Sequence, residues 1–188
     1  MLLGSKVDGE QLTAPDVARF MRVLLIAGHE TTAPALSFTL HRLATHPDEL
    51  HRLREEPGLI PLATEEFLRL SSNVTLQARN ATHDVELHGP MIARGDVVAL
   101  SFPSANRDQS AFPDAEQCVL DRSPNRHIAF GFGPHLCAGA HIARLELTVG
   151  LEVLAARVTD IRLAEDAAPA WNTTGSVRSL ATLPVTIG

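Results

Sequence analysis

Hydrophobic residues recur at helical spacing through the first part of the chain, between polar start and stop signals. The stretch from Thr13 to about His46 predicts one long helix. A capping box formed by Thr13 and Asp16 marks its beginning, and Pro47 marks its end. The run at residues 23–27 is apolar on every side, so we expect the centre of this helix to be buried.

A second helix is predicted over about residues 138–157. Its apolar side chains follow the same helical period, at Ile142, Leu145, Val149 and Leu154. Two shorter helices are predicted over residues 47–56 and 62–70, the first closed by Pro57 and Gly58.

The period changes to two after residue 73, which predicts strands. The expected strands lie at residues 74–79, 84–87 and 97–100, and the tail from Trp171 to Gly188 is expected to form turns and a terminal strand at 183–185. The predicted fold is therefore mainly α with small β-sheets (α+β), in one domain spanning residues 1–188.

Composition narrows the range of functions. The net charge of −6 does not favour a nucleic-acid partner or an anionic membrane surface. No apolar run reaches membrane-spanning length, so we expect no membrane partner and a soluble, cytoplasmic protein. Two cysteines, Cys118 and Cys137, give no disulfide framework, and Cys118 is expected to lie in the core.

The most unusual stretch is F-G-F-G-P-H-L-C-A-G at residues 130–139, directly before the second long helix. Cys137 lies at the N-terminal end of that helix, where free N–H groups and the helix dipole favour a thiolate. Gly131 and Gly133 allow backbone conformations that most residues avoid, and Gly139 leaves room for a flat object close to the helix. A stiff loop that presents one sulfur suits a thiolate ligand to haem iron.

Two other interpretations of this stretch remain open on the residues alone. Cys137 can be a buried free cysteine in a Gly/Pro turn, which is common for an isolated cysteine. Alternatively, His135 and His141 can join Cys137 in a zinc site, although no convincing fourth ligand is present.

The centre of the first helix also contains residues that weaken a helix. Gly28 is a poor helix former, and Pro34 cannot donate a hydrogen bond to the carbonyl of Glu30. Polar Glu30 and Thr31 in a weakened turn indicate function, whereas the alternative is a solvent-facing acid near a kink.

These stretches resemble conserved motifs of the cytochrome P-450 family, in the family's order. The haem loop F-x-x-G-x-[RH]-x-C-x-G is matched at Phe130, Gly133, His135, Cys137 and Gly139. Residues 27–32 are similar to [AG]-G-x-[DE]-T-[TS], residues 66–69 to E-x-x-R, and residues 105–108 to A-N-R-D. The resemblance covers nearly the whole chain but only the C-terminal half of the family fold.

The resemblance implies a role for each matching residue. Cys137 is expected to be the axial ligand to the iron of haem b, and Glu30 and Thr31 are expected to handle oxygen activation and protons. Other residues are expected to contact the haem, with Arg79, His127 and His135 at its propionates and Phe130, Gly131, Gly139, Ala27 and Gly28 around it. Glu66 and Arg69 are expected to be structural, with Arg122 preferred over Arg107 as their third partner. Asn73, Val74 and Thr75, with a loop at 173–177, are expected to line the substrate side.

The activity implied by the resemblance is haem-thiolate monooxygenation of a small hydrophobic organic substrate. Electrons are expected from NAD(P)H through ferredoxin and ferredoxin reductase, because no flavin or iron–sulfur motif is present. The alternative is a truncated, non-catalytic haem-binding remnant, or one piece of a split monooxygenase.

Overall fold

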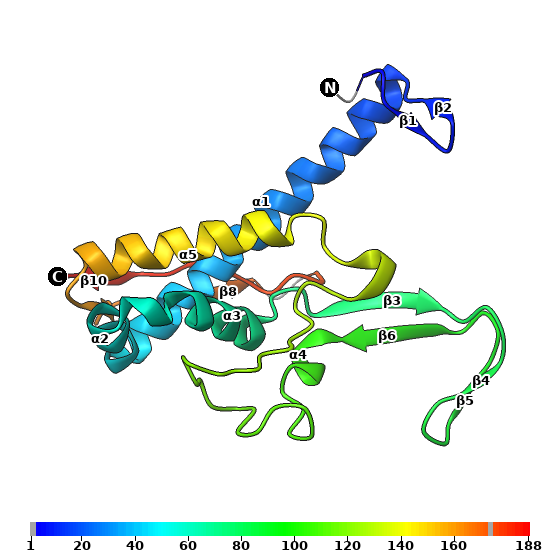
Figure 1. Cartoon of the computed structure of the whole chain (residues 1–188). Coiled ribbons are helices and arrows are strands. Elements are labelled where there is room, and N and C mark those ends of the chain that lie inside the picture. Colours follow the sequence, from blue (N-terminus) through cyan, green and yellow to red (C-terminus); the bar gives the residue numbers. More distant parts are fainter. Residues whose placement is uncertain (1–2, 173–174) are drawn as a thin grey trace.

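A computed structural model of the chain describes residues 3–172 and 175–188. Two long helices, α1 and α5, cross one another, and small two-stranded sheets lie around them (Figure 1). The helices are α1 (Ala14–Thr45), α2 (Pro47–Glu55), α3 (Ile60–Ser71), α4 (Phe102–Ala105) and α5 (Ala140–Arg157), with 3-10 turns at η1 (Pro57–Leu59) and η2 (Gly133–His135).

The strands form antiparallel pairs, each between two segments of the described chain. The pairs are β1 (Lys6–Val7) with β2 (Glu10–Gln11), β3 (Leu76–Asn80) with β6 (Val97–Ser101), β4 (Val85–Glu86) with β5 (Met91–Ile92), β7 (Ile161–Leu163) with β10 (Val185–Ile187), and β8 (Ala170–Asn172) with β9 (Ser179–Thr182). The predicted fold class, mainly α with small sheets, is confirmed.

Local sequence signals set both ends of α1. The side chain and the backbone N–H groups of Thr13 and Asp16 satisfy one another in the predicted capping box. At the other end, the His46 N–H donates to the Arg42 carbonyl at 2.8 Å, and α2 begins at Pro47. The helix runs through Pro34 without interruption, so the prediction of one long helix is confirmed.

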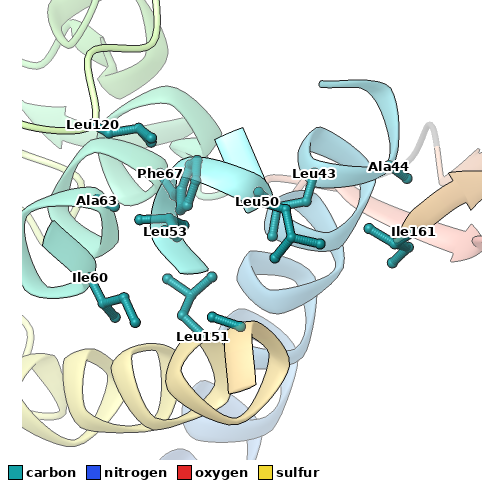
Figure 2. Close-up of a cluster of buried hydrophobic side chains, with 11 residues drawn as sticks. Leu43, Ala44, Leu50, Leu53, Ile60, Ala63, Phe67, Leu120, Leu151 and Ile161 are labelled. Atoms are coloured by element: carbon teal, nitrogen blue, oxygen red, sulfur yellow. The ribbon is translucent and has the colours of Figure 1, made fainter. Parts of the chain in front are cut away.

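The main core lies where the C-terminal half of α1 meets α2, α3 and α5. Figure 2 shows leucine, isoleucine and phenylalanine side chains from these helices converging there. The buried members are Leu43, Ala44, Leu50, Leu53, Ile60, Ala63, Phe67, Leu120, Leu151, Ala155 and Ile161. Burying each of the large side chains contributes roughly 1.5–3 kcal/mol, so this cluster holds the helices together.

The prediction that the centre of α1 is buried is wrong for residues 23–27. Val23 is 62 % exposed, Leu25 68 % and Ile26 53 %. The reason is visible in Figure 1, where the N-terminal half of α1 extends away from the other helices and carries the β1–β2 hairpin at its tip. The apolar residues Ile142, Leu145 and Val149 on α5 are also exposed, and α5 instead buries a row that includes Leu147 and Leu151.

The chain between α3 and α5 forms a long hairpin followed by irregular loops. β3 and β6 pair from Leu76 opposite Ser101 to Asn80 opposite Val97, and the β4–β5 pair lies at the hairpin's far end (Figure 1). Val74, predicted inside the first strand, forms an isolated bridge with Val177 instead. Within the described residues, no helix is both long and apolar enough to cross a membrane.

Candidate functional site

The Cys137 loop, residues 130–139, is closed by backbone hydrogen bonds. The Cys137 N–H donates to the Phe130 carbonyl at 2.9 Å, and the Leu136 N–H donates to the Gly133 carbonyl at 3.0 Å. Gly131 and Gly133 have φ angles of 74° and 68°, in the left-handed region that favours glycine. A Cβ at Gly131 would also lie 3.3 Å from the His135 carbonyl oxygen. The backbone therefore fixes the loop and leaves Cys137 exposed at its end.

The surroundings of the sulfur are open and apolar. A Cβ built on Gly139 would lie 3.9 Å from the Cys137 Sγ atom, so glycine keeps the space beside the sulfur clear. Phe132 and Leu136 on the same loop are 85 % and 58 % exposed. This surface can accept a flat apolar group and offer it one sulfur ligand. The buried-cysteine interpretation of Cys137 is wrong.

Phe130 anchors the loop to the helices. Its side chain packs against a small buried cluster of Ala35 from α1, Leu68 from α3 and Leu147 from α5. The Arg144 guanidinium lies over the Phe130 ring, 4.6 Å from its centroid. The loop is thereby tied to α1, α3 and α5.

The turn of α1 at residues 27–32 is held by two polar contacts. The Thr31 hydroxyl donates to the Ala27 carbonyl at 2.8 Å, one turn earlier. The Asn73 amide donates to the Thr31 carbonyl at 2.8 Å, which links this turn to the end of α3. Because Thr31 and Asn73 are 42 residues apart, sequence reasoning did not find this contact; the only signal was a polar residue just after a helix end.

A cavity of about 590 Å³ opens between this turn of α1 and the C-terminal tail. Glu30, His29 and Pro34 line one side, and the tail lines the other with residues that include Ser176 and Val177. The predicted substrate-side residues 74 and 75 meet the same tail, since the Thr75 N–H and hydroxyl donate to the Ser176 carbonyl at 2.8 and 3.0 Å. Residues 173 and 174 of the predicted loop lie outside the described residues.

The three candidate propionate ligands differ in availability. Arg79 is exposed on β3 and donates to the carbonyl of its neighbour Ala78 at 2.8 Å. His135 is exposed in the 3-10 turn of the Cys137 loop. The ring of His127 is only 1 % exposed, and both of its nitrogens have partners inside the chain.

Those partners define a polar cluster that sequence reasoning missed. The His127 Nε2 atom lies 3.0 Å from the Glu65 carboxylate, which also accepts from the Arg144 guanidinium at 2.7 and 3.0 Å. The Ala129 N–H donates to His127 Nδ1 at 3.2 Å, so Nε2 carries the proton donated to Glu65. The propionate role of His127 therefore stays a prediction that competes with these contacts.

Glu65 is strongly favoured in its charged form. Burial acts to raise the pKa of its carboxyl, but hydrogen bonds from His127 and Arg144 outweigh it and lower the pKa from 4.5 to about 2. Glu65 connects α3 to the segment just before the Cys137 loop through His127, and to α5 through Arg144.

The structure brings Glu66, Arg69 and Arg122 together in one buried group. Arg69 binds the Glu66 carboxylate through two hydrogen bonds of 2.8 Å, and Arg122 Nε lies 3.1 Å from both carboxylate oxygens. Arg69 also donates to the carbonyls of Asn106 and Ala115, each at 2.7 Å. The group thus joins α3 to the irregular segment before the Cys137 loop.

Arg107 lies elsewhere. It donates to the Leu70 carbonyl at 2.7 Å and pairs with Glu116 at 3.4 Å. The choice of Arg122 as the third partner of Glu66 and Arg69 agrees with these contacts. In the part of the chain that the structure describes, no group of three His, Cys, Asp or Glu residues could hold a metal ion, so the zinc alternative gains no support.

Comparison with known proteins gives consistent matches over this whole arrangement. A sequence model of the family described as "Cytochrome P450" matches residues 1–58 and 59–156. A Bacillus subtilis (strain 168) protein named "Cytochrome P450" is 38 % identical over 98 % of this chain and 45 % of its own length. A "Steroid C26-monooxygenase" of Mycolicibacterium smegmatis is 40 % identical over 89 % of this chain and 42 % of its own length.

Solved structures match equally well. The crystal structure of CYP109E1 from Bacillus megaterium in complex with corticosterone has a TM-score of 0.91 and 36 % identity, covering 98 % of this chain and 50 % of that chain. The chain therefore spans about half the length of the relatives it matches.

Proposed function

The chain belongs to the cytochrome P450 family, and on this premise we propose that it forms the haem-binding half of a haem-thiolate monooxygenase. The overall reaction converts RH, O₂, two electrons and two protons to ROH and water. The observation that carries the proposal is the Cys137 loop, where hydrogen bonds and left-handed glycines hold an exposed thiol beside an open apolar surface.

In this proposal the Cys137 thiolate would hold the iron of haem b, and Gly139 would leave room for the porphyrin beside the sulfur. Bound haem would supply the redox-active iron that activates dioxygen. Phe130 and Gly131 would contact the haem from the loop, and Ala27 and Gly28 would contact it from α1. A Cβ on Gly28 would meet no atom of the described chain within 4 Å, so this part of α1 has open space beside it.

Arg79 and His135 bind the haem propionates in this proposal. Both are exposed and are able to donate to carboxylates that are otherwise costly to bury. Both ring nitrogens of His127 already have partners, because Nε2 donates to Glu65 and Nδ1 accepts from the Ala129 N–H. We therefore expect Arg79→Gln to weaken haem binding more than His127→Gln.

Thr31 and Glu30, both on α1, would handle the protons of the reaction. The Thr31 hydroxyl directs its proton to the Ala27 carbonyl, which leaves an oxygen lone pair free to accept a hydrogen bond from water or a bound reactant. Glu30 lines the cavity of about 590 Å³ and can take protons from solvent there. Exclusion of bulk water from this cavity needs the remainder of the family fold.

Substrate and electron donors are assigned by class. The named relatives include a steroid C26-monooxygenase and a methyl-branched lipid omega-hydroxylase, which supports a small hydrophobic organic substrate for this protein. Electrons come from NAD(P)H through ferredoxin and ferredoxin reductase, with all components in the cytoplasm.

Titration of the chain with ferric haem, followed by Soret absorbance, tests the proposal. Cys137→Ala should greatly weaken binding, whereas Cys118→Ala should not, because burial raises the pKa of the Cys118 thiol to about 12 and keeps it from acting as a ligand. Equal haem affinity of the wild-type chain and Cys137→Ala would contradict the proposal.

A second candidate is that the chain works as one piece of a split monooxygenase. The exposed apolar residues on α1 and α5, among them Leu25, Ile26, Ile142 and Leu145, support it because such surface is seldom left uncovered. Co-expression with the N-terminal half of a P450 relative should yield a complex with the wild-type chain. The double variant Leu25→Glu, Ile142→Glu should not form this complex. Equal complex formation by this double variant would contradict it.

A further inference from the structure

A second cavity, of about 300 Å³, opens on a different part of the molecule. It lies among the C-terminal half of α1, the end of α3, the segment after α4 and β8, and it shares no lining residue with the α1 cavity beside Glu30. Its walls include the rings of Phe38 and Trp171 and the guanidinium groups of Arg107 and Arg178. The proposed haem chemistry uses none of these four side chains.

Arg178 is held in place without a carboxylate partner. Its backbone N–H donates to the Asn73 carbonyl at 2.7 Å, and its guanidinium carbon lies 4.5 Å from the Phe38 ring centroid and 5.4 Å from that of Trp171. The two rings themselves are 5.1 Å apart. Among the described residues, the guanidinium has no hydrogen bond or ion pair, so its N–H groups are available to a ligand.

The charges around Arg178 leave a local excess of positive charge. Arg42, which also lines the cavity, is neutralised by Glu49 through hydrogen bonds of 2.9 and 3.1 Å. Arg107 pairs at 3.4 Å with Glu116, whose side chain is 70 % exposed. Burial, and then the charge of Arg107, lowers the pKa of Arg178. An anion between the two guanidiniums would relieve this repulsion.

We propose that this cavity is a binding site for an oxyanion group, a carboxylate or a phosphate, held by Arg178 and Arg107. The guanidinium fork matches both groups through two parallel hydrogen bonds. Stacking on Phe38 and Trp171 fixes the plane of the fork, so less freedom is lost when the ligand binds. The site is independent of the proposed monooxygenase function.

The chain contains a single tryptophan, and it lies in this wall, so its fluorescence reports directly on the site. The wild-type chain is titrated with sodium phosphate and, separately, with sodium citrate, against sodium chloride of equal ionic strength. We expect a saturable change in Trp171 fluorescence with phosphate or citrate and none with chloride. Tighter binding of phosphate indicates a phosphate-bearing ligand, and tighter binding of citrate indicates a carboxylate-bearing ligand.

Matched variants then locate the binding. Arg178→Gln should weaken binding at least tenfold, which is about 1.4 kcal/mol, and Arg178→Lys should recover part of the loss by restoring the charge without the fork. Arg162→Gln is the control, because the exposed side chain of Arg162 on β7 pairs with Asp160. If Arg178→Gln loses helical circular dichroism, the anion affinity of Arg178→Lys is compared with that of the wild-type chain instead, and a weaker affinity of Arg178→Lys supports the proposal. No saturable change in the wild-type chain, or equal affinity in the Arg178 variants, would overturn the proposal.

Discussion

Replacing Glu65 by glutamine should destabilise the chain measurably, because its carboxylate joins α3 to α5 and to the segment just before the Cys137 loop. Burial opposes its charge, yet His127 and Arg144 lower its pKa from 4.5 to about 2. A pKa difference of that size corresponds to about 3 kcal/mol of stabilisation. A quarter of the side chain is exposed (25 %), so solvent screening reduces the expected loss to about 2 kcal/mol.

The pH dependence gives this prediction its sharpest test. A carboxyl whose pKa is lower in the folded state stabilises the fold above its unfolded pKa, and the contribution is lost as the pH falls toward the folded pKa. For Glu65, the difference in unfolding free energy between wild type and Glu65→Gln should be constant above about pH 5 and shrink between pH 4.5 and about 2.

Urea unfolding followed by circular dichroism at about pH 7 and about pH 3 measures this difference. Glu86→Gln is a matched control, since Glu86 is an exposed strand residue without an ion pair among the described residues; it should change stability by less than about 0.5 kcal/mol. A Glu65→Gln chain as stable as the control at neutral pH, or a difference that persists unchanged at about pH 3, would refute the reasoning.

Three further experiments test other parts of the structure. Glu66→Gln should destabilise by about 3–5 kcal/mol in urea unfolding, because it leaves two buried guanidiniums poorly compensated; a loss below about 1 kcal/mol would show that the group is not buried. Leu53→Ala should cost about 2–5 kcal/mol, whereas Leu25→Ala, at an exposed position, should cost less than about 0.5 kcal/mol in the same assay. Gly131→Ala should lower both thermal stability and haem affinity, because residue 131 has a positive φ. Gly28→Ala, in open helical space, should raise stability by about 1 kcal/mol. A Gly131→Ala chain more stable than Gly28→Ala would contradict the loop geometry.

The sequence predicts best those elements that local chemistry determines. The capping box at Thr13 and the proline at residue 47 locate the ends of α1 to within a residue, because both act on the neighbouring backbone alone. The hairpin was less well placed, since Val74 bridges to the distant Val177 rather than continuing β3. Strand ends depend on a partner, and the partner is not adjacent in sequence.

Burial could not be predicted from apolarity at residues 23–27. An all-round apolar helix indicates that something covers it, but the pattern does not say which segment does so. In the described chain the covering segment is absent, and Leu25 and Ile26 are exposed. The same holds for the α5 residues Ile142 and Leu145.

The candidate site shows a similar division. The glycines before Cys137 predict the loop from sequence, because their positive φ angles are a local property of the backbone. Glu65 and Glu66 are adjacent and chemically identical, yet helix geometry turns them toward different partners, His127 with Arg144 and Arg69 with Arg122. Only Glu66 forms an i, i+3 pair that sequence spacing can suggest. The contacts of Glu65 span 62 and 79 residues.

The central claim is that this chain folds into a surface that binds haem through the Cys137 thiolate. The most direct test is the absorption spectrum of the haem-loaded, reduced chain under carbon monoxide, with Cys137→Ala alongside. We predict a Soret band at the red-shifted position characteristic of a thiolate ligand in the wild-type chain and its loss in the variant. A band typical of an imidazole ligand, or no haem uptake by the wild-type chain, would contradict the claim.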